Sequence, residues 1–217
     1  ITNVSLTKTD PAHGEVFIRW MKPLADPYDF DTTEYPPPYK YILMHATGMH
    51  NQNLSPIATF TSTVFKTAID TTYMDTGLNT QQNSYNYKIN FYSGLTLVGS
   101  SASASSIYLG TRRGNHSVTL GWASVVPWAD STYNIYRKDP PPALSYIFIA
   151  TTPNKTYTDT GLANGYQYCY YVESVSHYAD TNIEHPLYDS SETICAIPED
   201  TIPPCAPPLA IAAKCNL

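Results

Sequence analysis

The hexapeptide Tyr73-Met74-Asp75-Thr76-Gly77-Leu78 returns 84 residues later, as Tyr157-Thr158-Asp159-Thr160-Gly161-Leu162. Each copy leads into an alternating tyrosine segment, which begins at Tyr85 in the first half of the chain and at Tyr168 in the second. We interpret the hexapeptide as a turn and the tyrosine segment as a strand whose alternate side chains face a core. A turn and a strand repeated in the same order predict two copies of one domain.

The composition indicates an all-β protein. The 217 residues give two domains enough chain to bury a core each. Only 14% of the residues are charged, whereas the chain has 19 tyrosines and 18 prolines. Tyrosine is favoured on half-buried pleated surfaces, and proline separates strands. No segment has apolar residues at helical spacing, so we expect few helices or none.

The strand pattern also repeats. A strand over residues 15–20 ends at Trp20, and its counterpart over residues 118–122 ends at Trp122. We expect both indoles to lie in the core of a β-sandwich. Other strands of the first copy are expected at 39–46, 57–63, 64–71, 85–92 and 98–109. The predicted domains are 1–109 and 110–199, followed by a proline-rich hinge and the start of a further domain at 200–217. The chain begins without Met, so we expect a piece of a longer protein.

The charge and the distribution of apolar residues argue against two classes of protein. The formal net charge is −6, and the adjacent Arg112 and Arg113 are isolated, so nucleic-acid binding is not expected. No apolar run reaches about 18 residues, so no membrane span is expected.

The short strands, the tryptophan that ends the second strand and the leucine-then-tyrosine corner resemble the fibronectin type III sandwich. The resemblance implies that Tyr85 and Tyr168 are corner tyrosines whose hydroxyls bond back to the preceding turn. It also implies that Leu78 and Leu162 fill the core beneath them. The implied fold is two immunoglobulin-like β-sandwiches in tandem.

Eight short segments, spread over nearly the whole chain, carry a narrower resemblance: Pro36–Tyr41, Asp75–Thr80, Ser106–Leu109, Val126–Trp128, Tyr136–Lys138, Tyr168–Ser174, Cys195–Asp200 and Pro203–Pro207. With these segments in this order, the chain resembles a tandem fibronectin type III region of exported Bacteroidota proteins. Those proteins carry a gliding-motility-associated C-terminal sorting domain, recognised by the type IX secretion system, and that sorting domain is not in this sequence. The resemblance implies export to the cell surface.

All four cysteines lie in the second half of the chain, and none forms a C-x-x-C pair, which argues against zinc or a redox centre. An even number of cysteines in such a β protein favours disulfides and export. Because Tyr168 faces the core, strand alternation turns Cys169 outward. We therefore predict an outer-face Cys169–Cys195 disulfide, with Cys205–Cys215 as the second pair and reduced thiols as the alternative.

An acidic loop is the one candidate metal site. It offers several carboxylate oxygens, as calcium loops do, but lacks the glycine-centred twelve-residue pattern of an EF-hand. We interpret it as a solvated loop, with calcium as the alternative, and expect no cofactor. Its acidic residues are Asp26, Asp29, Asp31 and Glu34.

No catalytic residue stands out. The sequence has no nucleophile-elbow motif, no phosphate-binding glycine loop and no pair of carboxylates set apart by a motif. We therefore do not expect an enzyme. The leading interpretation is a structural spacer and interaction module of an exported cell-surface protein, whose partners are the neighbouring domains of the parent chain.

The alternative is a binding module that uses loops at one end of a sandwich to hold a polysaccharide or a surface protein. Its best candidates are Trp128, Tyr178 and Tyr188, because exposed aromatic rings stack on sugars and anchor protein interfaces. The competing explanation for Trp128 is that it covers the end of a core or packs where the two domains meet.

Overall fold

The computed structural model describes residues 1–22, 30–65, 71–126, 128–178, 183 and 185–200, and this part of the chain is entirely strands, turns and loops. The predicted all-β class is confirmed. Within these ranges no helix is long and apolar enough to cross a membrane. The strands are β1 (Asn3–Lys8), β2 (Gly14–Arg19), β3 (Tyr39–Thr47), β4 (Ser55–Ser62), β5 (Thr72–Leu78), β6 (Tyr85–Ser93), β7 (Thr96–Ser100), β8 (Ala104–Ser105), β9 (Tyr108–Gly114), β10 (Ser117–Ala123), β11 (Ala129–Lys138), β12 (Ile147–Thr152), β13 (Thr156–Thr160), β14 (Tyr168–His177), β15 (Leu187–Ser190) and β16 (Ile194–Ala196).

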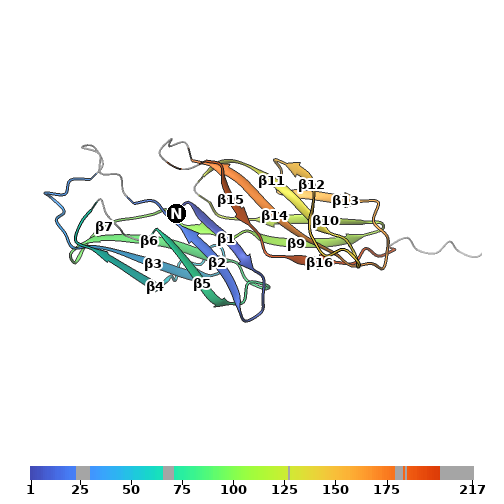
Figure 1. Ribbon diagram of the computed structural model, residues 1–217, viewed down its shortest axis with the longest axis horizontal. Helices are drawn as coiled ribbons and strands as arrows, with labels where there is room; N and C mark the ends of the chain where they lie inside the picture. Colours follow the sequence, from blue (N-terminus) through green and yellow to red (C-terminus); the bar gives the residue numbers. More distant parts are fainter. Residues whose placement is uncertain (23–29, 66–70, 127, 179–182, 184, 201–217) are drawn as a thin grey trace, which may run out of the picture.

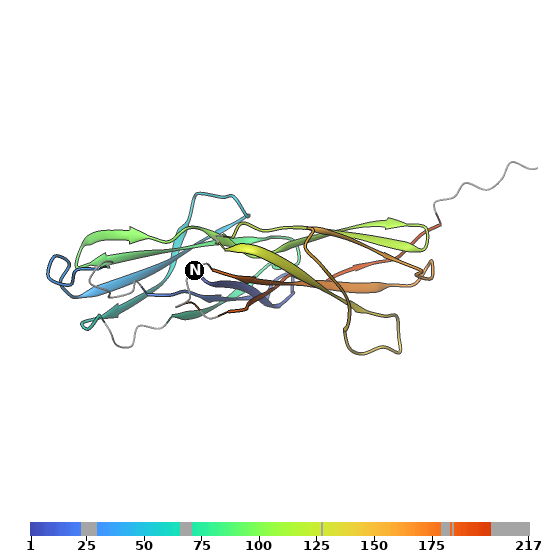
Figure 2. The same cartoon turned by 90° about the horizontal axis from the view of Figure 1, so that it is seen from above.

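The strands form two sandwiches of the same design, placed end to end (Figures 1 and 2). In the first, the sheet β1-β2-β5 packs on the sheet β4-β3-β6-β7, and β8 also pairs with β6. In the second, β13-β10-β9 packs on β12-β11-β14-β15, and β16 also pairs with β14. All the pairings are antiparallel. This strand order is that of the fibronectin type III sandwich.

Each sandwich has its own core, built by strand alternation. Trp20 is 2% exposed in the first core and Trp122 is 6% exposed in the second. Ile107 and Leu109 pack in the second core, and β9 pairs with β10. The second sandwich therefore starts several residues before position 110, and the return strand expected at 98–109 is replaced by the short strands β7 and β8.

The repeated hexapeptide is a strand and not a turn. It forms most of β5 in the first sandwich, and its second copy forms most of β13. Gly77 and Gly161 both have a φ of 74°, a conformation that suits glycine. Gly77 is the extra residue at a bulge before Leu78, the last residue of β5 to pair, whereas Gly161 directly follows β13. The strand expected at 64–71 is not formed at Val64 and Phe65, and residues 66–70 lie outside the described part.

The corner tyrosines bond to the backbone in the same way twice. The Tyr85 hydroxyl accepts the Asn79 N–H at 3.0 Å, and the Tyr168 hydroxyl accepts the Ala163 N–H at 3.1 Å. Leu78 and Leu162 are buried beneath them, at 7% and 3% exposure.

A second repeated feature is a buried carboxylate that sequence inspection missed. Asp75 accepts hydrogen bonds from the Tyr87 hydroxyl at 2.9 Å and pairs with His45 Nδ1 at 2.8 Å.

In the second sandwich Asp159 accepts the Tyr170 hydroxyl at 2.9 Å and Arg137 Nη1 at 3.0 Å. The two sandwiches therefore share the carboxylate and the tyrosine, but the third partner is a histidine in one and an arginine in the other.

The predicted Cys169–Cys195 disulfide is present and joins β14 to β16. Cys195 is exposed, so the bridge lies on the outer face of the sheet. Cys205 and Cys215 lie outside the described residues.

Candidate functional site: the joint between the two sandwiches

The chain segment that joins the sandwiches is buried and bonded to both of them. Ser106 and Ile107 are 0% and 2% exposed. Ser106 Oγ accepts the Tyr85 N–H at 3.0 Å, which ties the segment to the first sandwich. The Leu109 N–H donates to Glu192 Oε1 at 2.7 Å, which ties it to the second. Linkers that leave domains free are exposed to solvent, whereas this segment is serine-rich but buried and hydrogen-bonded on both sides.

Beside this segment, β8 bonds to the loop after β10. The Ser105 N–H donates to the Val125 carbonyl at 2.7 Å, and the Val125 N–H donates to Ser105 Oγ at 2.8 Å. These two bonds connect the first sandwich to the second without using the linker itself.

A second connection runs along β1 and β15, which lie side by side in Figure 1. Asp189 Oδ1 accepts the Val4 N–H at 3.1 Å and Asn3 Nδ2 at 3.3 Å. Further along, the Ser190 N–H donates to Ser5 Oγ at 2.9 Å and the Thr193 N–H to Thr9 Oγ1 at 2.8 Å. Both strands are sheet edges, whose unpaired backbone groups need partners, and here side chains of the other sandwich supply them.

The apolar part of the joint contains Trp128. This residue comes from the loop before β11 of the second sandwich, yet it packs in the first core and is 8% exposed. Val126 and Tyr178 pack against the same core, with the Trp128 and Tyr178 rings 6.2 Å apart. The Tyr178 hydroxyl donates to the Ile1 carbonyl.

The proposed use of Trp128 as an exposed binding residue is therefore wrong, and the competing explanation, packing where the domains meet, is the one the structure supports. Tyr178 is occupied at the joint as well. Tyr188 is 50% exposed and is the remaining member of that predicted group on the surface.

Two carboxyl groups are buried at or beside the joint. Asp189 is 2% exposed, and desolvation raises its pKa to about 7, although bonds from Asn3 and Val4 and the charge of Arg19 act in the opposite direction. Glu192 is 3% exposed, and desolvation raises its pKa to about 7 against the opposing bond from Leu109. Both groups bond to backbone N–H groups, which is the pattern of a structural carboxyl.

The acidic loop shows no sign of a metal site in its described part. Asp31 accepts the Thr33 and Glu34 N–H groups at 2.7 Å and 3.4 Å, and hydrogen bonds from Thr33 and Glu34 lower its pKa. Asp26 and Asp29 lie outside the described residues. Among the residues the structure describes, no three His, Cys, Asp or Glu side chains gather as a metal site would require.

A cleft of about 240 Å³ opens beside the contact between β1 and β15. One wall is the end of β1, Leu6–Thr9. The other wall belongs to the second sandwich and consists of Tyr146, Tyr171, Ser190, Ser191 and Thr193. We call this space the interdomain cleft.

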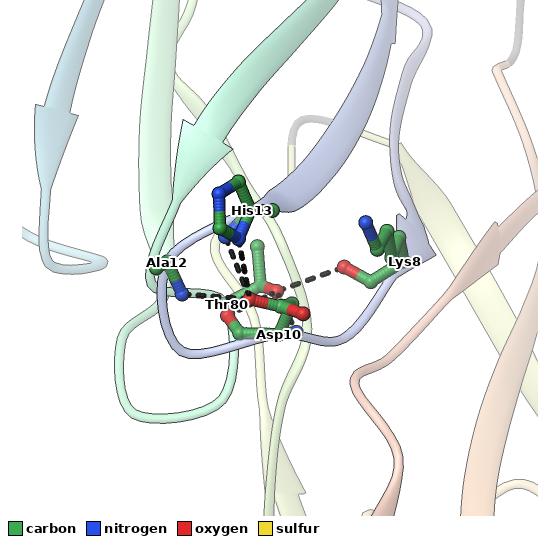
Figure 3. Close-up of polar contacts among 5 residues, drawn as sticks. All are labelled: Lys8, Asp10, Ala12, His13 and Thr80. Atoms are coloured by element: carbon green, nitrogen blue, oxygen red, sulfur yellow. Dashed lines mark hydrogen bonds and ion pairs between the residues drawn. The ribbon is translucent and has the colours of Figure 1, made fainter.

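The β1 wall of the interdomain cleft is held by the turn that follows it (Figure 3). Asp10 accepts the Ala12 and His13 N–H groups at 2.8 Å and 2.7 Å. Thr80, which is fully buried, donates to the Lys8 carbonyl at 2.8 Å and accepts the Asp10 N–H at 3.0 Å. The backbone at Lys8 and Thr9 is thus fixed from the first sandwich.

Many solved structures are similar to this chain, two of which are described here, whereas no family model and no curated protein matches it. One is the FN1–FN3 region of chicken CNTN1, at 15% identity and a TM-score of 0.31, covering 91% of this chain and 67% of that one. The other is a two-domain fibronectin type III segment of chicken tenascin, at 16% identity and a TM-score of 0.31, covering 91% and 98%. The strand order and the two separate cores define the class of this protein: a tandem of fibronectin type III-like sandwiches.

Proposed function

We propose that this chain is a non-catalytic spacer and interaction module of a larger exported bacterial cell-surface protein. The observation that carries the proposal is the joint. Hydrogen bonds cross from one sandwich to the other on two sides of a buried linker, and an indole of the second sandwich lies in the first core. Such a joint holds the two sandwiches at one angle, which is what a spacer needs in order to set the position of its neighbours.

We propose no catalytic role for the two carboxyl groups whose pKa values burial raises. Raised carboxyl pKa values often mark active sites, but Asp189 and Glu192 are nearly inaccessible and are bonded to backbone N–H groups. Their environment explains them as parts of the joint. Fibronectin type III-like folds are also used mostly as structural or interaction modules, although fold alone does not define function.

Two features support export. The Cys169–Cys195 disulfide is of the kind that persists in oxidising surroundings. The sequence also resembles the tandem region of Bacteroidota proteins that leave the cell by type IX secretion.

Surface shaving tests the location. Intact cells would be treated briefly with trypsin, and the released peptides of the parent protein identified by mass spectrometry in wild type and in a strain without type IX secretion. We expect release from wild type alone, with peptides of an abundant cytoplasmic protein as the control for lysis. Recovery of the parent protein from the cytoplasm of both strains, with none released, would contradict the proposal.

A further inference from the structure

The outer face of the second sandwich carries a cluster of four aromatic rings that reaches the interdomain cleft. Tyr136 on β11 and Tyr171 on β14 are directly paired across the strands, with their rings stacked 4.6 Å apart at an angle of 6°. Phe148 meets Tyr136 edge-on at 5.9 Å, and Tyr146 meets Tyr171 edge-on at 5.0 Å. We call these four residues the aromatic cluster.

The aromatic cluster is not part of the core. Ile135 and Tyr170, which directly precede Tyr136 and Tyr171 along their strands, are fully buried in the second core, so alternation turns Tyr136 and Tyr171 outward. Phe148 remains 56% exposed. Aromatic rings that gather on the surface do not pack in a core. Exposed patches of this kind usually mark binding sites.

The interdomain cleft adds polar residues to the surface that the aromatic cluster forms. Its lining has two tyrosines, five serine or threonine residues and one lysine, Lys8, and it has no acidic residue. A second lysine places its ammonium group, Lys138 Nζ, 5.4 Å from the centre of the Tyr146 ring. Hydroxyl-bearing residues, aromatic rings and two lysines therefore surround one place, and the acidic group beside them is Glu173, which accepts a hydrogen bond from the Tyr136 hydroxyl at 3.3 Å.

We propose that the interdomain cleft and the adjoining aromatic cluster bind a polysaccharide, with a preference for chains that carry carboxylate groups. The C–H faces of a sugar ring pack on aromatic rings, while its hydroxyls need donors and acceptors such as those of the cleft. The ammonium groups of Lys8 and Lys138 would attract the carboxylates. A stable protein interface buries about 1,200–2,000 Å², far more surface than the walls of a cleft of about 240 Å³ present, whereas a few sugar rings fit a space of this size.

The site is formed in advance of binding. Lys8 and Thr9 are held by the Asp10 turn and by Thr80, and the opposite wall is held against β1 by the bond between Thr193 and Thr9. A ligand would therefore not have to order the two walls, which lowers the cost of binding. The proposal does not depend on the spacer role, because it requires only that the two walls stay together.

Affinity gel electrophoresis tests the proposal on the whole chain. The protein would be run in native gels containing alginate or polygalacturonate, which carry carboxylates, or xylan or laminarin. We expect retardation in at least one carboxylate-bearing gel, weakened about tenfold by Tyr146→Ala. Lys8→Ala should weaken retardation by the acidic chains and leave any retardation by laminarin unchanged.

The matched control is Tyr92→Ala. Tyr92 also lies under a lysine, with Lys40 Nζ 4.7 Å from the ring centre, but it belongs to the first sandwich and does not line the cleft. Tyr171→Ala removes a ring that lines the cleft and also belongs to the aromatic cluster, so it should weaken retardation as Tyr146→Ala does. Unchanged melting temperatures would show that the variants are folded.

Retardation that Tyr92→Ala preserves and that both Tyr146→Ala and Tyr171→Ala reduce would support the site. Absence of retardation in all four gels would overturn the proposal. So would retardation that the cleft variants leave unchanged, and retardation by laminarin alone would overturn the preference for carboxylates.

Discussion

Asp189→Asn separates the charge of the buried carboxyl from its hydrogen bonds. The amide oxygen of asparagine can accept the Val4 and Asn3 N–H groups as the carboxylate does, but it carries no charge. The variant therefore tests whether burial at the joint makes the folded protein sensitive to pH.

The sign follows from the raised pKa. Burial raises the pKa of Asp189 from 3.8 to about 7, so between these values the folded protein retains a proton that the unfolded chain releases. The free energy of unfolding should then fall as the pH rises from about 4 to about 7 and stay level above it. Each pKa unit corresponds to about 1.4 kcal/mol, which gives an upper limit of about 4 kcal/mol for this residue.

Glu192 contributes in the same direction, because burial raises its pKa to about 7 as well. The useful quantity is therefore the difference between the variant and wild type, in which the Glu192 contribution cancels. We expect the free energy of unfolding of Asp189→Asn, relative to that of wild type, to rise by up to about 4 kcal/mol between about pH 4 and about pH 7.

Urea unfolding followed by tryptophan fluorescence measures this difference at a series of pH values. Glu34→Gln, which removes a carboxylate at an exposed position, is the control and should give a small difference at every pH. If Asp189→Asn differs from wild type by the same amount at about pH 4 and about pH 8, the reasoning about Asp189 is wrong.

Four further predictions concern, in turn, the packing of Trp128, the buried carboxylates, the disulfide and the acidic loop. Trp128→Ala should destabilise the first sandwich by about 3–5 kcal/mol, seen as faster hydrogen exchange in β2 and β6, although the residue comes from the second; unchanged exchange there would refute the packing assignment. Tyr87→Phe and Tyr170→Phe should each cost about 1.5–3 kcal/mol in urea unfolding, because each removes a bond to a buried carboxylate; a cost near zero would contradict this. Replacing Cys169 and Cys195 by serine should cost about 3 kcal/mol, since the bridge closes a loop of sequence separation 26; an equal urea midpoint would argue against it. Calcium should leave the melting temperature unchanged, and a rise that EDTA reverses would restore the acidic-loop site.

The sequence was most informative where a pattern repeats locally. Strand alternation and the two tryptophans predict two sandwiches. Parity predicts that Cys169 faces outward, and the structure shows that it is bonded there to Cys195 of the neighbouring strand. The hexapeptide was misread because Asp-Thr-Gly is a typical turn sequence. Its strand is polar because β5 is an edge strand, and alternate residues of such a strand face solvent.

The joint could not be predicted from the sequence, because its partners lie far apart in the chain. Val4 and Asp189 are separated by 185 positions, and nothing local marks Asp189 as buried. Trp128 is buried only because the first sandwich covers it. The exchange of His45 for Arg137 could have been found, since the offset of 92 that relates Tyr41 to Tyr133 relates these two residues as well.

Backbone ¹⁵N relaxation tests the central claim, that the joint fixes one sandwich relative to the other. Amides of β2, β3 and β6 would be compared with amides of β10, β11 and β14 in the intact chain. We predict that a single anisotropic diffusion tensor fits both sets, because hydrogen bonds and Trp128 hold the sandwiches as one body. Two separate tensors, each with the shorter correlation time of a single sandwich, would contradict the fixed joint and the spacer function built on it.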